Sequence, residues 1–334
     1  MKKLFTLLSL LIGVLLFCIV IEWVGWKEIK EAFFVLLSYK GLVILALTVS
    51  AWLVAFWRWR FILSSQGHSF SFFKLGEIFF AGQAVIYFFQ PPAYFGSEIL
   101  RAYAAEKNLS VPREKSFASI FIERILATTA YLVFLILGVV AFLFLTGLLF
   151  KDFLIIIAIL IGLAVAGLTV FYLTALRKKS VFRILLKIFR IRKIKDDGIL
   201  KKVEREISLF FDFRKAIMWK GLSIALLRSL LLFLRCWFLV FFLRGEMGIL
   251  VPLVVMFFLN LSYLFPLPAG LGILETTQVF AFGSLGLGAA TGVAFSFVIR
   301  GTEIVMSLFS LVLLIRLGMK LSIKNIEKYS KHFT

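Results

Sequence analysis

The chain has 334 residues, of which 62% are hydrophobic and only 17% are charged, and its mean hydropathy is +1.02. A water-soluble domain contains nearer half apolar residues, so this composition predicts an all-α integral membrane protein and excludes the soluble enzyme classes. Two cysteines, two histidines and four aspartates leave little material for metal binding or nucleophilic catalysis. We therefore expect no cofactor, no metal site and no enzymatic activity.

Six apolar segments are long enough to cross a membrane, which requires about 20 residues. In chain order these segments are Leu4–Ile21, Gly41–Trp57, Phe117–Phe150, Phe153–Leu176, Trp219–Leu243 and Gly288–Ile315. We expect each of them to form a transmembrane helix, and we expect residues 1–334 to form a single membrane domain.

Two further apolar regions, Phe70–Phe89 and Ile249–Phe265, each run into a segment rich in proline and glycine. Proline stops a helix and forces the preceding residue out of the α-helical conformation. These regions therefore predict two re-entrant helical hairpins. The residues expected at their turns are Pro91, Pro92 and Gly96 in the first hairpin and Pro266, Pro268, Gly270 and Gly272 in the second.

The basic residues are distributed unevenly along this pattern. Twenty-nine of the 38 Lys and Arg residues fall on one side of the predicted membrane, five fall on the other, and four lie within the spans. The excess marks the cytoplasmic side and predicts a plasma-membrane protein with both termini in the cytoplasm. Such a surplus faces anionic lipid, so lipid is favoured over nucleic acid as a partner.

On the same side, residues 177–220 form a basic cytoplasmic loop and residues 319–334 a cytoplasmic tail. Within the loop, Val181–Phe189 and Ile199–Phe213 are amphipathic enough to lie on the membrane surface. A solvated linker and a docking site for a partner are both open interpretations of this loop.

An internal repeat appears when Pro92 is aligned with Pro268. Alanine follows each proline, glycine follows four residues later, and glutamate follows after six or seven. An arginine follows at 32 residues in both cases, namely Arg124 and Arg300. Because the two halves, residues 1–150 and 151–318, begin on opposite sides, we expect an inverted-topology repeat, which is typical of transporters.

Several ionisable residues lie in apolar surroundings, where a charge at a helix centre costs roughly 2.5–3.5 kcal/mol. A chain tolerates this cost where the groups pair with one another or line a polar cavity. The residues predicted to bind a substrate are Glu98, Arg101, Glu123, Arg124, Glu275, Arg300 and Glu303, with Arg228 and Arg235 as secondary candidates.

The spacing of these residues suggests how they are paired. Arg300 and Glu303 are three residues apart and share one face of a helix. Adjacent Glu123 and Arg124 point about 100° apart, so each is expected to have a partner on another helix. The two secondary arginines are seven residues apart on one stripe. An arrangement of interhelical salt bridges that only stabilise the bundle stays open as the alternative.

The chemistry of these groups favours a phosphate-bearing amphiphile. A broken helix presents free N–H groups that suit an anion, and arginine binds phosphate in a bidentate manner. We expect Arg124 and Arg300 to hold phosphate, and Glu98 and Glu275 to select or gate the headgroup. Candidate ligands are an anionic phospholipid and a polyprenyl or glycolipid phosphate.

At these residues the chain resembles the flippase-like transmembrane module of the lysylphosphatidylglycerol synthase (MprF-type) family, as a stand-alone member without the synthase domain. The resemblance is carried by Trp57-Arg58-Trp59-Arg60, Pro92, Gly96-Ser97-Glu98, Arg101-Ala102-Tyr103, Glu123-Arg124, Pro266-Leu267-Pro268-Ala269-Gly270-Leu271-Gly272, Glu275 and Ile299-Arg300. The family often has an acidic residue shortly after its Glu-Arg pair, where this chain has Ala127. The resemblance implies two re-entrant elements and a role in moving or accommodating lipids.

The sequence therefore predicts a lipid flippase or translocase that binds a phosphate-bearing headgroup between its two hairpins. A proton-coupled solute transporter is one alternative, and a membrane partner or regulator of a lipid-modifying enzyme is another. Partners other than lipid that remain open are a second copy of the chain and a separate synthase.

Overall fold

The computed structural model describes residue 34 and residues 37–68, 70–88, 93–147, 151–176, 197–245, 248–263 and 272–330. Within these ranges all regular secondary structure is α-helix, joined by short turns and loops. The helices are α3 (Tyr39–Ser65), α4 (Phe72–Phe88), α5 (Ala93–Leu109), α6 (Arg113–Thr146), α7 (Lys151–Leu176), α9 (Asp197–Phe210), α10 (Ala216–Arg244), α11 (Leu250–Ser262), α12 (Ile273–Ser284) and α13 (Ala289–Ser330).

Five of the six predicted spans correspond to long helices in this structure. Among the described residues, α3, α6, α10 and the part of α13 up to Gly318 are long and apolar enough to cross a membrane, and α7 contributes a shorter apolar stretch, Ile161–Ala175. The helix α13 continues to Ser330, so the expected tail begins as helix. The predicted first span, Leu4–Ile21, and Val181–Phe189 lie outside the described residues, as do the hairpin residues Pro91, Pro92, Pro266, Pro268 and Gly270.

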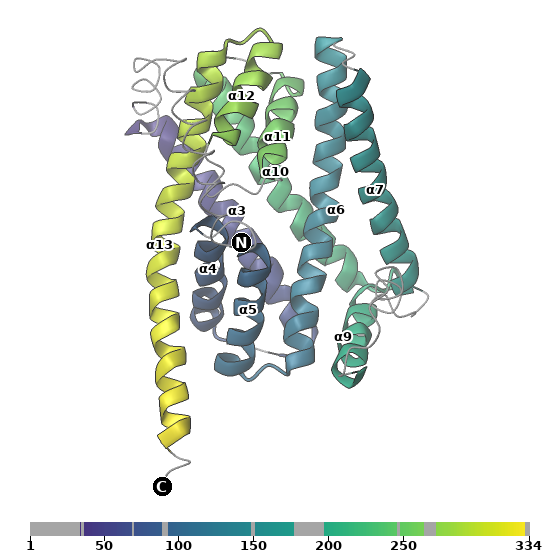
Figure 1. Cartoon of the computed structure of the whole chain (residues 1–334), viewed down its shortest axis with the longest axis vertical. Coiled ribbons are helices and arrows are strands. Elements are labelled where there is room, and N and C mark those ends of the chain that lie inside the picture. The colour runs from purple at the N-terminus through teal and green to yellow at the C-terminus, as the bar shows by residue number, and fades with distance from the viewer. Residues whose placement is uncertain are drawn as a thin grey trace, which may run out of the picture.

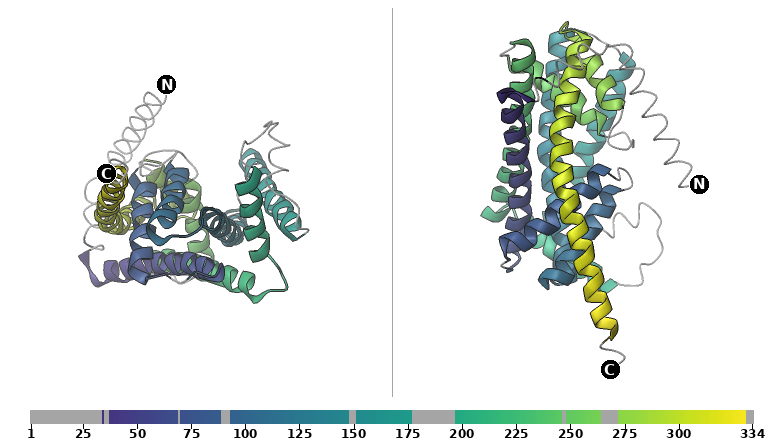
Figure 2. Two further views of the ribbon diagram at one scale, coloured as in Figure 1. Left: turned by 90° about the horizontal axis from the view of Figure 1, so that it is seen from below. Right: turned by 90° about the vertical axis from the view of Figure 1, so that its left-hand side faces the viewer.

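The helices form two similar sets, each made of a long helix, two short helices and a second long helix. The first set is α3, α4, α5 and α6, and the second is α10, α11, α12 and α13. In Figure 1, α3 runs downward and α6 upward, whereas α10 runs upward and α13 downward. The α4–α5 pair lies toward the lower end of the bundle and the α11–α12 pair toward the upper end, as both side views show (Figures 1 and 2).

The two sets pack against each other along their long helices. α3 lies along α10, and α4 lies along α13, while α6 packs on α11. The contact between α6 and α11 is close because Gly138 of α6 has no side chain: a Cβ there would lie 2.5 Å from Cβ of Phe257 and 2.7 Å from the carbonyl oxygen of Leu253. The buried aromatic residues of α11 and α12 fill the space beside this contact.

The lower end of the bundle in Figure 1 carries most of the basic segments. The end of α3, the end of α5, the start of α10 and the later part of α13 all lie there, together with α9. This agrees with the sorting of basic residues predicted from the sequence. However, Arg58 and Arg101, which were counted with these solvent-facing segments, are buried inside the bundle, with 4% and 5% of their surface exposed.

The amphipathic segment predicted at Ile199–Phe213 forms α9. Its apolar residues Val203, Ile207 and Phe210 are buried, and α9 packs on α6. Lys201 and Arg205 on the opposite face are exposed. The apolar face of α9 therefore packs against the protein instead of lying free on a membrane surface.

Candidate functional site

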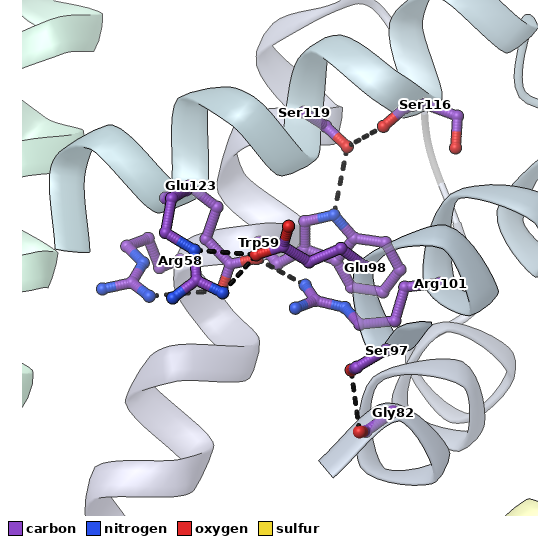
Figure 3. A network of polar contacts seen from close by, with 10 residues as sticks. Arg58, Trp59, Gly82, Ser97, Glu98, Arg101, Ser116, Ser119 and Glu123 are labelled. Carbon is purple, nitrogen blue, oxygen red and sulfur yellow. Dashed lines mark hydrogen bonds and ion pairs between the residues drawn. The ribbon is translucent and has the colours of Figure 1, made fainter. Parts of the chain in front are cut away.

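A carboxylate bridges two arginines at the centre of the first helix set (Figure 3). Glu123 of α6 accepts from Arg58 of α3 through Oε1 at 3.2 Å and from Arg101 of α5 through Oε2 at 2.5 Å. All three side chains are less than 9% exposed. One negative charge is thus shared by two buried guanidinium groups from two other helices, which leaves this group of three with a net positive charge.

Aromatic residues hold Arg101 in this position. Its guanidinium carbon lies 4.2 Å from the ring centre of Trp59 and 4.8 Å from that of Phe79, so both rings offer cation–π contacts. The indole Nε1 of Trp59 donates to Oγ of Ser119 at 3.1 Å, which ties α3 to α6. The stack fixes the direction from which Arg101 reaches Glu123.

The close approach of α4 and α5 depends on Gly82. A Cβ at this residue would lie 2.7 Å from Cδ of Arg101 and 3.0 Å from Oγ of Ser97. The same Oγ of Ser97 donates to the carbonyl oxygen of Gly82 at 2.8 Å. The absence of a side chain at Gly82 therefore leaves the space in which the stem of Arg101 lies.

A second pair in the same region is more accessible. Nε of Arg124 on α6 donates to Oε1 of Glu98 on α5 at 2.7 Å, and a terminal guanidinium nitrogen also contacts this oxygen. The side chain of Arg124 is 47% exposed and that of Glu98 is 21% exposed. We call Arg58, Glu98, Arg101, Glu123 and Arg124 the first charged cluster.

A buried pair occupies the corresponding place in the second helix set. Glu275 of α12 accepts from Nε of Arg300 at 2.9 Å and from a terminal nitrogen of Arg300 at 2.7 Å, both through Oε1. Its Oε2 accepts from the backbone N–H of Gly272 at 2.9 Å, at the first turn of α12. Glu275 is 0% exposed. The carboxylate therefore both caps its own helix and holds an arginine of α13.

An ion pair also connects the outer helices of the second set. Nη1 of Arg235 on α10 donates to Oε1 of Glu303 on α13 at 3.4 Å, and the hydroxyl of Tyr263 donates to the same oxygen at 2.8 Å. We call Arg235, Glu275, Arg300 and Glu303 the second charged cluster. The phenol of Tyr87 on α4 interacts electrostatically with Arg300, Glu275 and Glu303, so the first helix set also reaches this cluster.

The two clusters correspond in register. Under the alignment of Pro92 with Pro268, Glu98 and Glu275 are nearly equivalent, and Arg124 and Arg300 are equivalent. The structure joins each of these glutamates to its own arginine. In each set, moreover, an arginine of the first long helix is paired with a glutamate of the last: Arg58 with Glu123, and Arg235 with Glu303.

The structure confirms the pairing predicted for Glu123 and Arg124 and supplies the partners of Arg300 and Glu303. Glu123 and Arg124 each have a partner on another helix, as their adjacency predicted. Arg300 and Glu303, which the spacing places on one helix face, pair with residues of two different helices, α12 and α10. Arg124 and Arg300, which were predicted to hold phosphate, form ion pairs with Glu98 and Glu275, the two glutamates that were predicted to select the headgroup.

Arg228, the other secondary candidate, has a different environment from Arg235. It is half-buried on α10, and its Nε is buried without a hydrogen-bond partner. Among the described residues it takes part in no ion pair within 4 Å. Its charge interacts with Arg58, Glu123 and Arg124 of the first cluster and with Arg235 of the second.

Several residues of the site were not singled out from the sequence as site residues. Trp59, Gly82, Ser97, Tyr87 and Tyr263 are common residue types in membrane helices, and no spacing marks them. The Trp57-Arg58-Trp59-Arg60 motif was a signal that could have placed Arg58 and Trp59 in the site. Within the described part of the chain, no three His, Cys, Asp or Glu side chains gather in a way that could hold a metal.

Comparison with known proteins matches the chain to one family profile and to two related membrane proteins. The profile described as "Lysylphosphatidylglycerol synthase TM region" matches residues 6–310. A UPF0104 membrane protein of Methanocaldococcus jannaschii is 24% identical over 293 residues, which cover 83% of this chain and 84% of that protein. A UPF0104 membrane protein of Pyrococcus horikoshii is 28% identical over 309 residues, which cover 86% and 89%. No solved structure matches the chain significantly.

Proposed function

The chain belongs to the lysylphosphatidylglycerol synthase TM-region family, and on this basis we propose that it is a lipid translocator of the plasma membrane. In this proposal it binds a phosphate-bearing lipid headgroup between the α4–α5 pair and the α11–α12 pair. The observation that carries the proposal is the presence of two equivalent charged clusters inside apolar helices, each with a glutamate from a short helix pair.

The cost of these charges argues for a function beyond holding helices together. Each ionisable group at membrane depth costs several kcal/mol unless it is paired or hydrated, and such groups mark substrate pathways. Apolar residues could join α5 to α6 or α12 to α13 with no such penalty. We therefore interpret the pairs as groups that a polar headgroup displaces during passage.

The arrangement of helices supports an inverted repeat with re-entrant hairpins. The long helices of the two sets run in opposite directions, and the short pairs lie toward opposite ends of the bundle (Figure 1). At 17, 17, 13 and 12 residues, the short helices α4, α5, α11 and α12 are shorter than the four described helices that qualify as spans. Inverted repeats of this kind form substrate sites where the broken helices of the two halves meet.

The accessibility of the pairs suggests an order of contact. Arg124 and Glu98 are partly exposed, whereas Arg300 and Glu275 are buried. Because arginine binds phosphate in a bidentate manner, a headgroup phosphate competes with Glu98 for Arg124 first. In this proposal the basic lower end of the bundle faces the cytoplasm, so the accessible pair lies in the half nearer to that side.

The test is a lipid-translocation assay with the full chain in vesicles. Fluorescent phosphatidylglycerol, phosphatidylethanolamine and phosphatidic acid are incorporated, and a membrane-impermeant quencher reports the fraction that reaches the outer leaflet over time. The double variant Glu98→Gln/Arg124→Gln removes both charges of the accessible pair together, so no charge loses its partner. We expect it to slow translocation at least tenfold.

The matched control is Glu106→Gln/Lys107→Gln, which removes the ion pair between adjacent residues of α5. We expect this control to translocate lipid as the wild type does. If the wild type moves none of the three lipids faster than empty vesicles do, the proposed function is wrong.

A further inference from the structure

The positive charges of the structure are unevenly matched by carboxylates. The second charged cluster contains two arginines and two glutamates, and its charges balance. The first contains three arginines against two glutamates. Arg228 interacts with this first cluster and has no ion-pair partner among the described residues. Counted over the part of the chain that the structure describes, the first cluster together with Arg228 has an excess of two positive charges.

Arg228 interacts electrostatically with residues of both charged clusters. Its charge interacts with three arginines, Arg58, Arg124 and Arg235, and with one carboxylate, Glu123. Glu123 already holds Arg58 and Arg101, and the buried Nε of Arg228 has no hydrogen-bond partner. Inside a membrane span, an arginine is expected to face a partner or a hydrated cavity. A buried guanidinium nitrogen without a partner, on an arginine that forms no ion pair among the described residues, therefore indicates a place for an anion.

From this charge balance we propose that Arg228, with Arg58 and Arg124, binds the phosphate of a lipid that carries it as a monoester with two negative charges. The inference rests on the proposed lipid function and specifies its substrate class. A guanidinium group matches the geometry of phosphate oxygens and binds them in pairs. An excess of two positive charges is neutralised by a phosphate monoester, which carries close to two negative charges above pH 7. A phosphodiester carries one negative charge and leaves the charge of one arginine uncompensated.

Substitution of Arg228 is expected to affect protein stability differently from substitution of the other buried arginines. Arg58, Arg101, Arg235 and Arg300 each hold a glutamate, so replacing any of them removes an arginine from a buried carboxylate. Arg228 holds none, so Arg228→Gln removes a repulsive charge and leaves no buried carboxylate unpaired. We expect this variant to fold and to melt at or above the temperature of the wild type.

The experiment measures ligand binding by the full-length protein in detergent at pH 8. The probes are phosphatidic acid, phosphatidylglycerol with the same acyl chains, and inorganic phosphate, and the readout is the ligand-dependent rise in melting temperature, from which apparent affinities follow. The variants are Arg228→Gln and Arg228→Lys. Arg205→Gln, on the exposed face of α9, is the control.

We expect the wild type and Arg205→Gln to bind phosphatidic acid about tenfold or more tightly than phosphatidylglycerol, the size of effect that one charge-assisted hydrogen bond supplies. Arg228→Gln should lose this preference. Arg228→Lys, which keeps the charge but not the fork of donors, should retain part of it. Binding of inorganic phosphate should depend on Arg228 in the same way. It should require much higher concentrations, because inorganic phosphate has no acyl chains.

Three results would overturn the inference. One is equal binding of the two lipids by the wild type, and another is an undiminished preference in Arg228→Gln. The third is binding of inorganic phosphate at the same concentrations as phosphatidic acid, which would make the ligand a soluble phosphate. If the wild type shows no preference for phosphatidic acid but fluorescent lipids still cross the vesicle membrane, the translocator proposal stands and the inference about Arg228 is wrong. If the preference for phosphatidic acid depends on Arg228 but no fluorescent lipid crosses the vesicle membrane, the binding site stands and the proposal of lipid translocation is wrong.

Discussion

Neutralising Glu123 should destabilise the protein more than neutralising one of its partners. In the wild type this carboxylate holds both Arg58 and Arg101, and all three side chains are buried. Removing one partner of a buried ion pair costs about 3–5 kcal/mol, because it leaves a charge uncompensated. Glu123→Gln leaves two such charges, so we place its cost at the upper end of that range. Arg58→Gln leaves Glu123 bound to Arg101 and should cost about 1.5–3 kcal/mol, the worth of one charged hydrogen bond.

The double variant provides the sharpest test. Arg58→Gln/Glu123→Gln leaves only Arg101 without a carboxylate, so it should be more stable than Glu123→Gln alone. The assay is the loss of the monodisperse peak in size-exclusion chromatography after heating, which gives an apparent melting temperature. At roughly 2 °C per kcal/mol, a cost at the upper end of that range means that Glu123→Gln should melt about 8–10 °C below the wild type.

Glu106→Gln serves as the control for this series, since its partner Lys107 is half-exposed and such surface pairs contribute about 1 kcal/mol or less. The reasoning would be refuted if Glu123→Gln melted within 1 °C of this control. It would also be refuted if the effects of the two single substitutions simply added in the double variant, because the three charges would then act independently.

Two other substitutions test the packing and the electrostatics at the lower end of the bundle. Gly82→Ala places a Cβ 2.7 Å from Cδ of Arg101 and should cost about 1–3 kcal/mol, whereas Gly76→Ala, whose Cβ would meet atoms only at 3.9 Å, should melt close to the wild type. His68 lies between α3 and α4. Burial lowers its pKa below 6.5, the positive charge of Lys115 lowers the pKa further, and the opposing effect of a glutamate on α9 is smaller. Because the unfolded chain accepts a proton that the folded state disfavours, stability should fall as the pH drops through about 6.5, and His68→Gln should show a smaller loss of melting temperature between pH 7.5 and 5.

Much of the helix pattern follows from the sequence because a bilayer imposes a length on apolar segments. The expected spans Gly41–Trp57 and Trp219–Leu243 lie within α3 and α10, with ends displaced by no more than eight residues. The largest displacement is at the end of α3, which continues through Arg58 to Ser65. The sequence pattern treats Arg58 as the first residue outside the apolar segment, whereas Glu123 compensates its charge within the helix bundle.

The pairing of charges was less predictable than their location. Spacing along one helix favours Arg300 with Glu303, because both lie on one face. The structure instead joins Arg300 to Glu275 and Glu303 to Arg235. Spacing describes neighbours on a single helix, and partners on other helices depend on how far each helix is rotated and how closely it packs.

The sequence by itself determined most of the residues that carry charge into the apolar helices, with Arg58 as the exception, and the alignment of the two prolines already paired the halves in register. The tertiary structure decided which of those charges neutralise one another. That decision rests on close helix contacts, such as the one that Gly82 permits between α4 and the stem of Arg101. A guanidinium group reaches a carboxylate only when two helices bring them within about 3 Å, and this geometry also leaves Arg228 without a partner among the described residues.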